Sequence, residues 1–170
     1  MKIPEDLQVP FAKGLARAEY GDLTAAEMER YLADPRRRST GFSPETAART
    51  VALLREAGVL DDKRTLRAMV RSLDRRLLGP RRIREELRRR LFPAAYVEAA
   101  MNREVDYAAR AYDLLLKTPR AAETAQTPEG RKKLAARLVR AGFEPALAFG
   151  AVKRLCAGAD DSFFEEENLN

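Results

Sequence analysis

Arginine is the residue whose number and spacing most clearly indicate a binding function. Residues 75–90 contain eight arginines and two glutamates, a local charge of +6 that equals the net charge of the whole chain. A guanidinium group binds phosphates and carboxylates through a planar fork of N–H donors. We therefore expect this segment to contact DNA phosphates or acidic protein side chains. The candidate contact residues are Arg75, Arg76, Arg81, Arg82, Arg84, Arg88 and Arg89.

A solvated helix surface is the alternative interpretation of this segment. Arg81 lies four residues before Glu85, and Glu86 lies four residues before Arg90, so both pairs could form along one helix. Two glutamates cannot balance eight arginines, which favours the binding role. A second basic group, expected in a loop, either extends the basic surface or is an exposed loop with no role. It consists of Arg36, Arg37 and Arg38.

The residue types that usually carry catalysis are scarce in this chain. Histidine is absent, which removes the side chain best suited to proton transfer near neutral pH and the commonest metal ligand. Cys156 is the single cysteine, and its place on an apolar helix stripe predicts a core position. Neither of the glycine-rich phosphate loops, GxxxxGK or GxGxxG, occurs. We therefore expect no catalytic residue, no metal ligand and no cofactor site, and a protein that is not an enzyme.

The adjacent carboxylates Asp61 and Asp62 are the remaining candidates for acid–base or metal chemistry. No third ligand lies near them in the sequence, and a helix is expected to begin there. Because aspartate side chains accept hydrogen bonds from the first amides of a helix, we interpret both as helix caps. A carboxylate-based enzyme is the most remote of the functions considered.

Helix start and stop signals divide the chain into nine expected helices. Thr24 and Glu27 form a capping box. Ser43-Pro44 and Thr127-Pro128 each place a cap before a proline, and Gly79-Pro80 repeats the arrangement. The alternation typical of strands is missing. The expected helices are 10–19, 24–34, 44–57, 62–77, 80–91, 93–104, 105–117, 128–141 and 145–157, with surface loops at 33–40 and 118–127.

A phenylalanine next to a helix-opening proline recurs about every 50 residues. Phe42 and Phe92 are 50 positions apart, and Phe92 and Phe143 are 51 apart. Since each lies between two expected helices, we interpret them as core residues rather than as platforms for stacking bases. A period of this length is typical of stacked helical units. We therefore predict an all-α fold of three tandem three-helix repeats that form an elongated, curved array.

The repeats are expected at residues 1–60, which include an N-terminal extension, at 61–104 and at 105–158. Residues 159–170 contain five acidic residues and no basic one, and we expect them to form an unstructured acidic tail. Phe163 and Phe164 within it could dock on a partner or on the arginine surface. Because no leader-like segment and no long apolar run is present, we expect a cytoplasmic protein without membrane contact.

The second repeat resembles the RecX regulatory proteins of bacteria. Residues 58–62 (Gly-Val-Leu-Asp-Asp) match the Leu-Asp-Asp turn of that family, and residues 79–87 match its Gly-Pro-x-x-Ile-x-x-x-Leu helix. Residues 133–143 resemble the closing repeat of the family. The chain differs at Thr65 and Leu66, where an aromatic residue and an alanine are usual, and at Leu91, where a glycine is usual.

This resemblance implies that the chain binds the RecA recombinase, particularly its filament on single-stranded DNA. Proteins of that family restrain filament growth, and with it strand exchange, ATP hydrolysis and co-protease activity, in DNA recombination, DNA repair and the SOS response. The resemblance implies no cofactor. We expect a monomer that binds a recombinase filament, with single-stranded or duplex DNA as a further partner. The alternative function is a stand-alone helical nucleic-acid-binding module.

Overall fold

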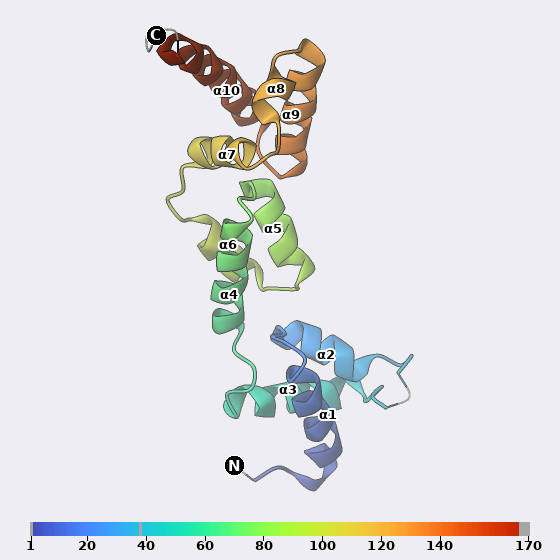
Figure 1. Cartoon of the computed structure of the whole chain (residues 1–170). Helices are drawn as coiled ribbons and strands as arrows, with labels where there is room; N and C mark the ends of the chain where they lie inside the picture. The colour runs from blue at the N-terminus through green and yellow to red at the C-terminus, as the bar shows by residue number, and fades with distance from the viewer. Residues whose placement is uncertain (1, 38, 167–170) are drawn as a thin grey trace. The chain divides into compact units, whose positions relative to one another are not determined.

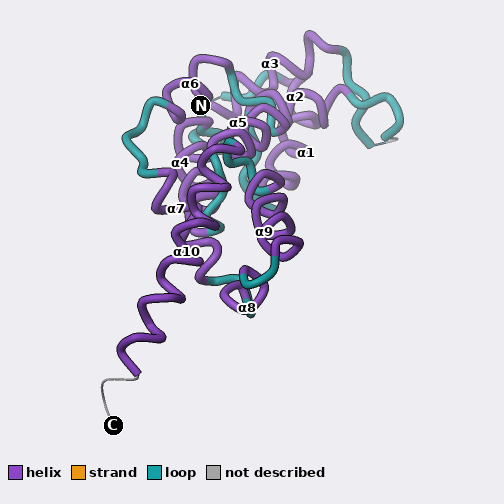
Figure 2. Tube along the Cα trace, turned by 90° about the horizontal axis from the view of Figure 1, so that it is seen from above, coloured by secondary structure: helices purple, strands orange, loops and turns teal. Residues whose placement is uncertain are grey.

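The computed structural model describes residues 2–37 and 39–166, and within these ranges the chain is helical with no β-strand. Figure 1 labels ten α-helices, which follow a short 3₁₀ helix at Glu5–Leu7. They are α1 (Gln8–Ala18), α2 (Ala25–Ala33), α3 (Pro44–Glu56), α4 (Asp62–Arg75), α5 (Pro80–Arg89), α6 (Ala94–Met101), α7 (Tyr107–Leu116), α8 (Ala121–Ala125), α9 (Pro128–Arg140) and α10 (Pro145–Glu166). The trace in Figure 2 shows helices and connecting loops only, so the all-α prediction is confirmed. None of the described helices is long and apolar enough to span a membrane.

The nine helices expected from the sequence are all present, with ends that agree within three residues except at the end of α10. The additional helix is α8, which lies against α9 (Figure 1) within residues 118–127. The prediction of a surface loop there is wrong, because Ala121 and Ala125 are buried. Helix α10 continues to Glu166, into the segment expected to be an acidic tail. Residues 167–170 of that segment lie outside the described residues.

Side-chain caps explain where several helices begin. The Thr24 hydroxyl accepts a hydrogen bond from the Glu27 amide (3.1 Å), and the Glu27 carboxylate accepts one from the Thr24 amide (2.9 Å), so the capping box is confirmed. Ser43 caps α3 and Thr127 caps α9, each before a proline, as expected. Asp106 caps α7, a role that the sequence analysis does not assign.

Four helices end in the same Schellman motif, in which a residue with positive φ follows the helix. These residues are Gly58 (φ 71°), Leu77 (54°), Leu91 (55°) and Gly142 (96°). In each case the next amide donates to the carbonyl five positions earlier. The four bonds are Val59 to Leu54 (2.9 Å), Leu78 to Leu73 (3.4 Å), Phe92 to Leu87 (3.4 Å) and Phe143 to Leu138 (3.1 Å). Glycine adopts this left-handed conformation without a steric cost, whereas leucine is strained in it.

The described chain forms two compact units. Unit 1 comprises Met1–Met69 and Leu87–Ala100, and unit 2 comprises Val70–Glu86 and Met101–Asn170. The boundary falls within α4 and within α5, so both helices continue from one unit into the other. Each unit has an apolar core of its own.

Helices α1, α2 and α3 enclose the core of unit 1, because α3 packs against both of the other two. Met28, Leu32 and Leu54 are fully buried there. Burying an apolar side chain of this size stabilises a fold by about 1.5–3 kcal/mol. Two of the recurring phenylalanines belong to this unit. Phe92 is buried, whereas Phe42 is half-buried against the core.

The core of unit 2 is formed by α7, α8, α9 and α10. Its fully buried side chains include Phe143, Leu115 and Leu138, and two of the three alanines of α8, Ala121 and Ala125, pack in the same core. The prediction that the recurring phenylalanines are core residues is therefore confirmed for Phe92 and Phe143.

Two glycines hold the start of α5 against the end of α9 within unit 2. The Gly79 amide donates to the Ala141 carbonyl (2.9 Å), and the Arg81 amide donates to the Gly142 carbonyl (3.1 Å). A Cβ atom at Gly79 would overlap the carbonyl carbon of Gly142, and one at Gly142 would overlap the Cβ of Arg82. Gly79 thus takes the cap position before Pro80 that the sequence predicts. The Gly142 carbonyl satisfies the Arg81 amide in the first turn of α5, and only glycine permits this approach.

Candidate phosphate-binding site

A hollow in unit 1 brings together arginines from α1, α2, the loop after α2 and the end of α5. We call it the arginine hollow, and its volume is about 360 Å³. Four arginines line it: Arg17, Arg30, Arg37 and Arg89. Two of these, Arg37 and Arg89, are contact residues predicted from the sequence. The structure therefore places in one site two predicted residues that are 52 positions apart.

Tyr31 orients two of the arginines that line the hollow. The guanidinium carbon of Arg17 lies 5.7 Å from the centre of the tyrosine ring, and that of Arg37 lies 5.0 Å from it. Both distances are within the range of a cation–π interaction. Asp34 also holds Arg37, with Nε and Oδ2 3.4 Å apart. These contacts restrict two long, flexible side chains to the wall of the hollow before any ligand arrives.

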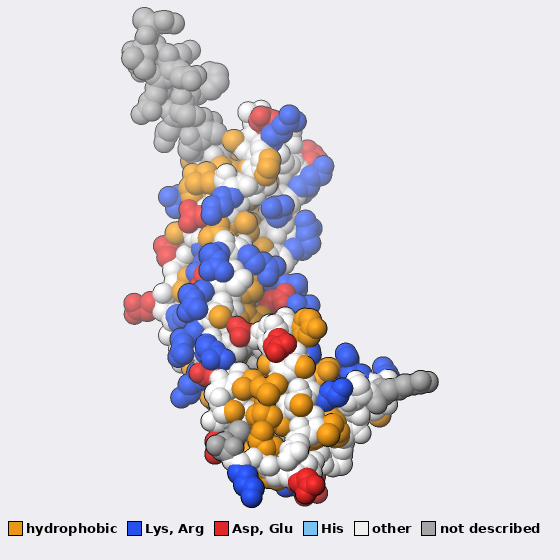
Figure 3. Space-filling model, turned by 60° about the horizontal axis from the view of Figure 1, so that its bottom comes forward, with side chains coloured by type: hydrophobic (Ala, Val, Ile, Leu, Met, Phe, Trp, Pro, Cys, Tyr) orange, Lys and Arg blue, Asp and Glu red, His pale blue; other side chains and the backbone are white. Residues whose placement is uncertain are grey.

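The hollow carries an excess of positive charge. Its four guanidinium groups share the lining with two carboxylates, those of Glu27 and Asp34. Glu27 also pairs with Arg90, which is not part of the lining, and Asp34 pairs with Arg37. A ligand that enters the hollow therefore meets a positive field, which favours phosphates and carboxylates. On the face drawn in Figure 3, Lys and Arg side chains outnumber Asp and Glu side chains.

Arg90 has a structural role in unit 1. Its guanidinium group pairs with Glu27 and donates to the Asp22 carbonyl (2.7 Å). Its own carbonyl accepts a hydrogen bond from the Thr24 hydroxyl (2.9 Å). The residue after α5 is thus tied to the start of α2, which brings Arg89 next to the residues of α2 that line the hollow.

The paired carboxylates Asp61 and Asp62 have different roles. Asp61 caps α4 by accepting a hydrogen bond from the Arg64 amide (3.0 Å), and this bond lowers the pKa of the Asp61 carboxyl. Asp62 is 5% exposed and accepts from the Ala25 amide at the start of α2 (2.7 Å) and from Arg55 (3.2 Å). The cap prediction is confirmed for Asp61 and is wrong for Asp62, which binds an amide of α2 rather than of α4. Among the described residues, no group of three His, Cys, Asp or Glu side chains could hold a metal ion.

The arginines at the start of α5 form ion pairs within unit 2. Arg82 binds Glu85 (2.9 Å) and Glu86 (2.9 Å), and the side chain of Glu86 is only 7% exposed. Arg81 lies 3.8 Å from Glu144. The expected pair of Arg81 with Glu85 is therefore wrong, because Glu85 binds Arg82 instead. Arg82, predicted to face outward as a contact residue, neutralises a buried carboxylate.

The remaining predicted contact residues are mostly exposed. Arg84 is half-buried, and Arg38 lies outside the described residues. The exposed ones are Arg36 and Arg88 in unit 1 and Arg75 and Arg76 in unit 2. Within the described ranges, the side chains of these four form no ion pair and no hydrogen bond.

An ion cluster in unit 2 uses two arginines that the sequence analysis does not single out. Asp74 accepts two hydrogen bonds from Arg103 (2.7 and 3.2 Å) and one from Arg110 (3.0 Å). The bond from Arg103 is the main cause that lowers the pKa of Asp74, and Arg110 lowers it further while partial burial opposes both. The same pairing raises the pKa of Arg103. Arg110 also donates to the Leu78 carbonyl in the loop after α4 (3.3 Å). The cluster therefore ties α4 to α7, through Arg110, and to the loop before α7, through Arg103.

Sequence reasoning misses Arg17, Arg30 and Tyr31 because no local spacing links them to Arg89. Only the packing of α1 and α2 with the end of α5 brings these side chains to one hollow.

Cys156, predicted to be a core residue, lies at the edge of the unit 2 core and is half-buried there. Its Sγ is 3.8 Å from the Ala125 carbonyl oxygen. No protein-family model matches the sequence.

Proposed function

We propose that the chain is a regulatory protein that binds a RecA-type recombinase, or its filament on single-stranded DNA, and restrains the growth and activity of that filament. It would act in DNA recombination, DNA repair and the SOS response, in the cytoplasm, without a cofactor or a catalytic role. The observation that carries the proposal is the arginine hollow, whose excess charge suits DNA phosphates or acidic side chains of the filament. The resemblance at residues 58–62 and 79–87 specifies which partner.

We also propose that the helices form three tandem repeats arranged as an elongated, curved array. A recurring local structure supports the repeats. Gly41, Leu91 and Gly142 each have a positive φ, and each is followed by a phenylalanine and then by a helix that begins at or next to a proline. The same backbone conformation at the same place in three segments of similar length is what repeat units are expected to show.

The proposed action follows from the chemistry of the hollow. Guanidinium groups that are already oriented by Tyr31 and Asp34 lose little conformational freedom when they bind a phosphate. Contact with the filament at this site would occupy groups that an incoming recombinase subunit needs, and would also oppose the movements that accompany ATP turnover. Both effects slow filament growth without any chemical step by the regulator.

The test replaces two hollow arginines that have no role in the core. Arg17→Gln with Arg30→Gln removes two positive charges but keeps residues that favour helix. The matched control is Lys63→Gln with Arg67→Gln, which removes two exposed charges of α4, also in unit 1 but outside the hollow. We expect the hollow variant to lose capture of the cognate recombinase on single-stranded DNA, and inhibition of its ATP hydrolysis, by roughly tenfold or more. The control should behave as the parent does, and a hollow variant that inhibits equally well would refute the proposal.

The second candidate function is a stand-alone nucleic-acid-binding module, which the same excess charge favours. In that case the chain binds DNA without a recombinase, and affinity falls steeply as salt rises. Binding of a labelled oligonucleotide across a salt series, with no recombinase present, separates the two functions. Strong binding with a steep salt slope, and no effect on a recombinase filament, would favour the module.

A further inference from the structure

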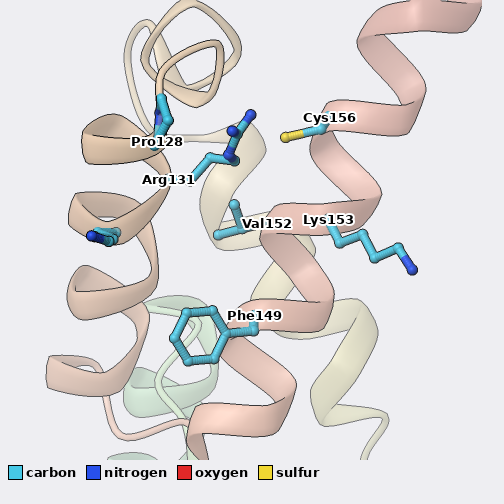
Figure 4. A pocket seen from close by; sticks show the side chains of 7 residues that line it. Pro128, Arg131, Phe149, Val152, Lys153 and Cys156 are labelled. Carbon is cyan, nitrogen blue, oxygen red and sulfur yellow. The ribbon is translucent and has the colours of Figure 1, made fainter.

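A groove between α9 and α10 in unit 2 has no part in the function proposed above. Its volume is about 490 Å³. The residues from α10 lie three and four positions apart, so they share one face of that helix: Phe149, Val152, Lys153 and Cys156. Figure 4 shows Phe149 and Cys156 pointing toward α9, and Val152 at the floor between the two helices.

The groove combines an apolar floor with a cationic rim. The Phe149 side chain is 61% exposed, which is unusual for a phenylalanine and leaves a large apolar ring without a partner. Arg131 and Lys132 from α9 and Lys153 from α10 supply the positive charge, and the amino group of Lys153 points away from α9 in Figure 4. Arg131 donates to the Ala125 carbonyl (3.2 Å), whereas neither lysine forms an ion pair within the described part of the chain. A ligand for this groove should therefore present apolar side chains beside carboxylates.

The chain itself contains a segment of this chemistry. Residues 160–170 hold five carboxylates, no basic residue and two adjacent phenylalanines, Phe163 and Phe164. Carboxylates lie on both sides of the phenylalanine pair, so both rings could enter an apolar groove while the acidic groups meet the cationic rim. No other stretch of the sequence combines adjacent aromatic residues with such an acidic surrounding.

Phe163 and Phe164 cannot reach the groove of their own molecule while α10 is intact. Phe163 is seven residues beyond Cys156 on the same helix, which runs from Pro145 to Glu166. A rise of about 1.5 Å per residue places it roughly 10 Å farther along the axis, past the end of the groove. Only another molecule can present the segment to this site without breaking α10.

We propose that the α9–α10 groove binds the C-terminal segment, residues 160–170, of a second copy of the chain. The two rings of Phe163 and Phe164 pack on Phe149 and Val152, and the carboxylates pair with Lys132 and Lys153. An apolar floor and a single exposed ring favour this peptide over a nucleic acid strand, which needs a row of stacking platforms along a charged path. The proposal goes beyond the regulatory function and does not depend on it.

The test compares the full chain with three variants by sedimentation velocity over a range of protein concentrations. The groove variant carries Phe149→Ser, Lys132→Gln and Lys153→Gln, and the tail variant ends after Ser162. The matched control carries Leu116→Ser, Lys117→Gln and Lys133→Gln, because Leu116 is 58% exposed and lies in the same unit but outside the groove. We expect the parent and the control to self-associate, and the groove and tail variants to do so at least about tenfold more weakly.

A mixture of the groove variant and the tail variant separates loss of docking from loss of folding. One keeps an intact segment and the other keeps an intact groove, so the mixture should associate although neither variant does so alone. A monomeric parent at every concentration, or a mixture that fails to associate while both variants are folded, would overturn the proposal.

The single cysteine reports on occupancy of the groove directly. Modification of Cys156 by a thiol reagent should slow as the concentration of the parent rises, and should not slow in the tail variant. Protection that is independent of concentration would show that the segment of the same molecule covers the groove, against the proposal. A thymidine oligonucleotide that protects Cys156 in a parent that remains monomeric would show a nucleic acid site instead, and would also overturn it.

Discussion

At the scale of single residues, arginine serves two purposes in this protein. Arg82, Arg90 and Arg103 bind carboxylates of the protein itself and hold elements together. Arg17 and Arg30 line a hollow whose carboxylates already have other partners. The guanidinium fork suits a carboxylate of the same chain as well as a phosphate of a ligand, so an arginine-rich segment does not reveal which of its members are available.

Gly79 packs closely against the backbone of Gly142, and replacing it tests that contact. Gly79→Ala places a Cβ in overlap with the backbone of Gly142, so the start of α5 must move away from the end of α9. We expect a loss of about 3 kcal/mol in the free energy of unfolding. Gly150→Ala on α10 is the control, because its Cβ meets no atom within 4 Å, and alanine there should stabilise the helix by about 0.5–1 kcal/mol. Urea denaturation of both variants measures the difference, and equal stabilities would contradict the contact.

Asp74 should make the stability of the protein depend on pH in the acid range. Arg103 lowers its pKa in the folded state, so the stabilisation is complete above the unfolded pKa of about 3.9 and is lost as the pH falls through the folded value. Asp74→Asn should cost about 1–3 kcal/mol at pH 7 and progressively less below about pH 4. Denaturation at a series of pH values measures this, with the exposed Asp113→Asn of α7 as the control. A difference between parent and variant that is the same at neutral and at acid pH would contradict the assigned ion cluster.

At the scale of elements, the helices resemble one another most closely at their ends. The same Schellman motif closes α3, α4, α5 and α9, with glycine in two cases and leucine in the other two. At Leu91 the chain keeps the left-handed conformation without the residue that favours it. The backbone there is imposed by its surroundings: Phe92 is buried directly after it, and Arg90 is tied to α2 directly before it.

Leu91→Gly should therefore stabilise the protein, although glycine usually weakens a helical protein. Relief of the left-handed strain in the folded state outweighs the added conformational freedom of the unfolded chain. We expect the free energy of unfolding to rise by about 0.5–1 kcal/mol. Val139→Gly is a matched control, because Val139 and Leu91 are both 38% exposed but Val139 lies inside α9. That change should cost about 1 kcal/mol. Thermal unfolding of the two variants should shift in opposite directions, and a lower melting temperature for Leu91→Gly would show that its conformation is not strained.

In helix α5, the roles of the individual arginines must be known before several of them are mutated together. Changing Arg81, Arg82, Arg88 and Arg89 to glutamine would test binding at the cost of folding, since Arg82 neutralises the buried Glu86. Removing a cation that pairs with a buried carboxylate costs more than losing a surface pair. The change of Arg17 and Arg30 avoids this, because neither arginine binds a buried carboxylate.

At the scale of the whole molecule, the net charge depends on the C-terminal segment. Ending the chain after Ala159 removes five carboxylates and raises the formal charge from +6 to +11. We expect non-specific DNA affinity to rise, with the largest gain at low salt, because exposed charges act over a Debye length of about 10 Å at 0.1 M salt. The free energy of unfolding should barely change, since Ala148, Ala151, Val152 and Leu155 of α10, which pack in the unit 2 core, all remain in the shortened chain. Anisotropy of a labelled duplex across a salt series measures the first effect, and a cooperative unfolding transition that disappears on truncation would contradict the second.

The sequence alone determined the helical class, the positions of nine helices and most of their starts. Caps such as Thr24 and Ser43, and periodic apolar residues such as Ile83 and Leu87, act within a few residues, and such local signals are legible without a fold. Only the tertiary structure decided the role of α8, whose short, alanine-rich stretch becomes a helix because Ala121 and Ala125 are buried in the core that α9 helps to form. The same holds for Asp62, which binds an amide 37 positions away, and for the arginine hollow, whose members come from separate segments. Long-range packing creates these contacts, and no spacing along the chain encodes them.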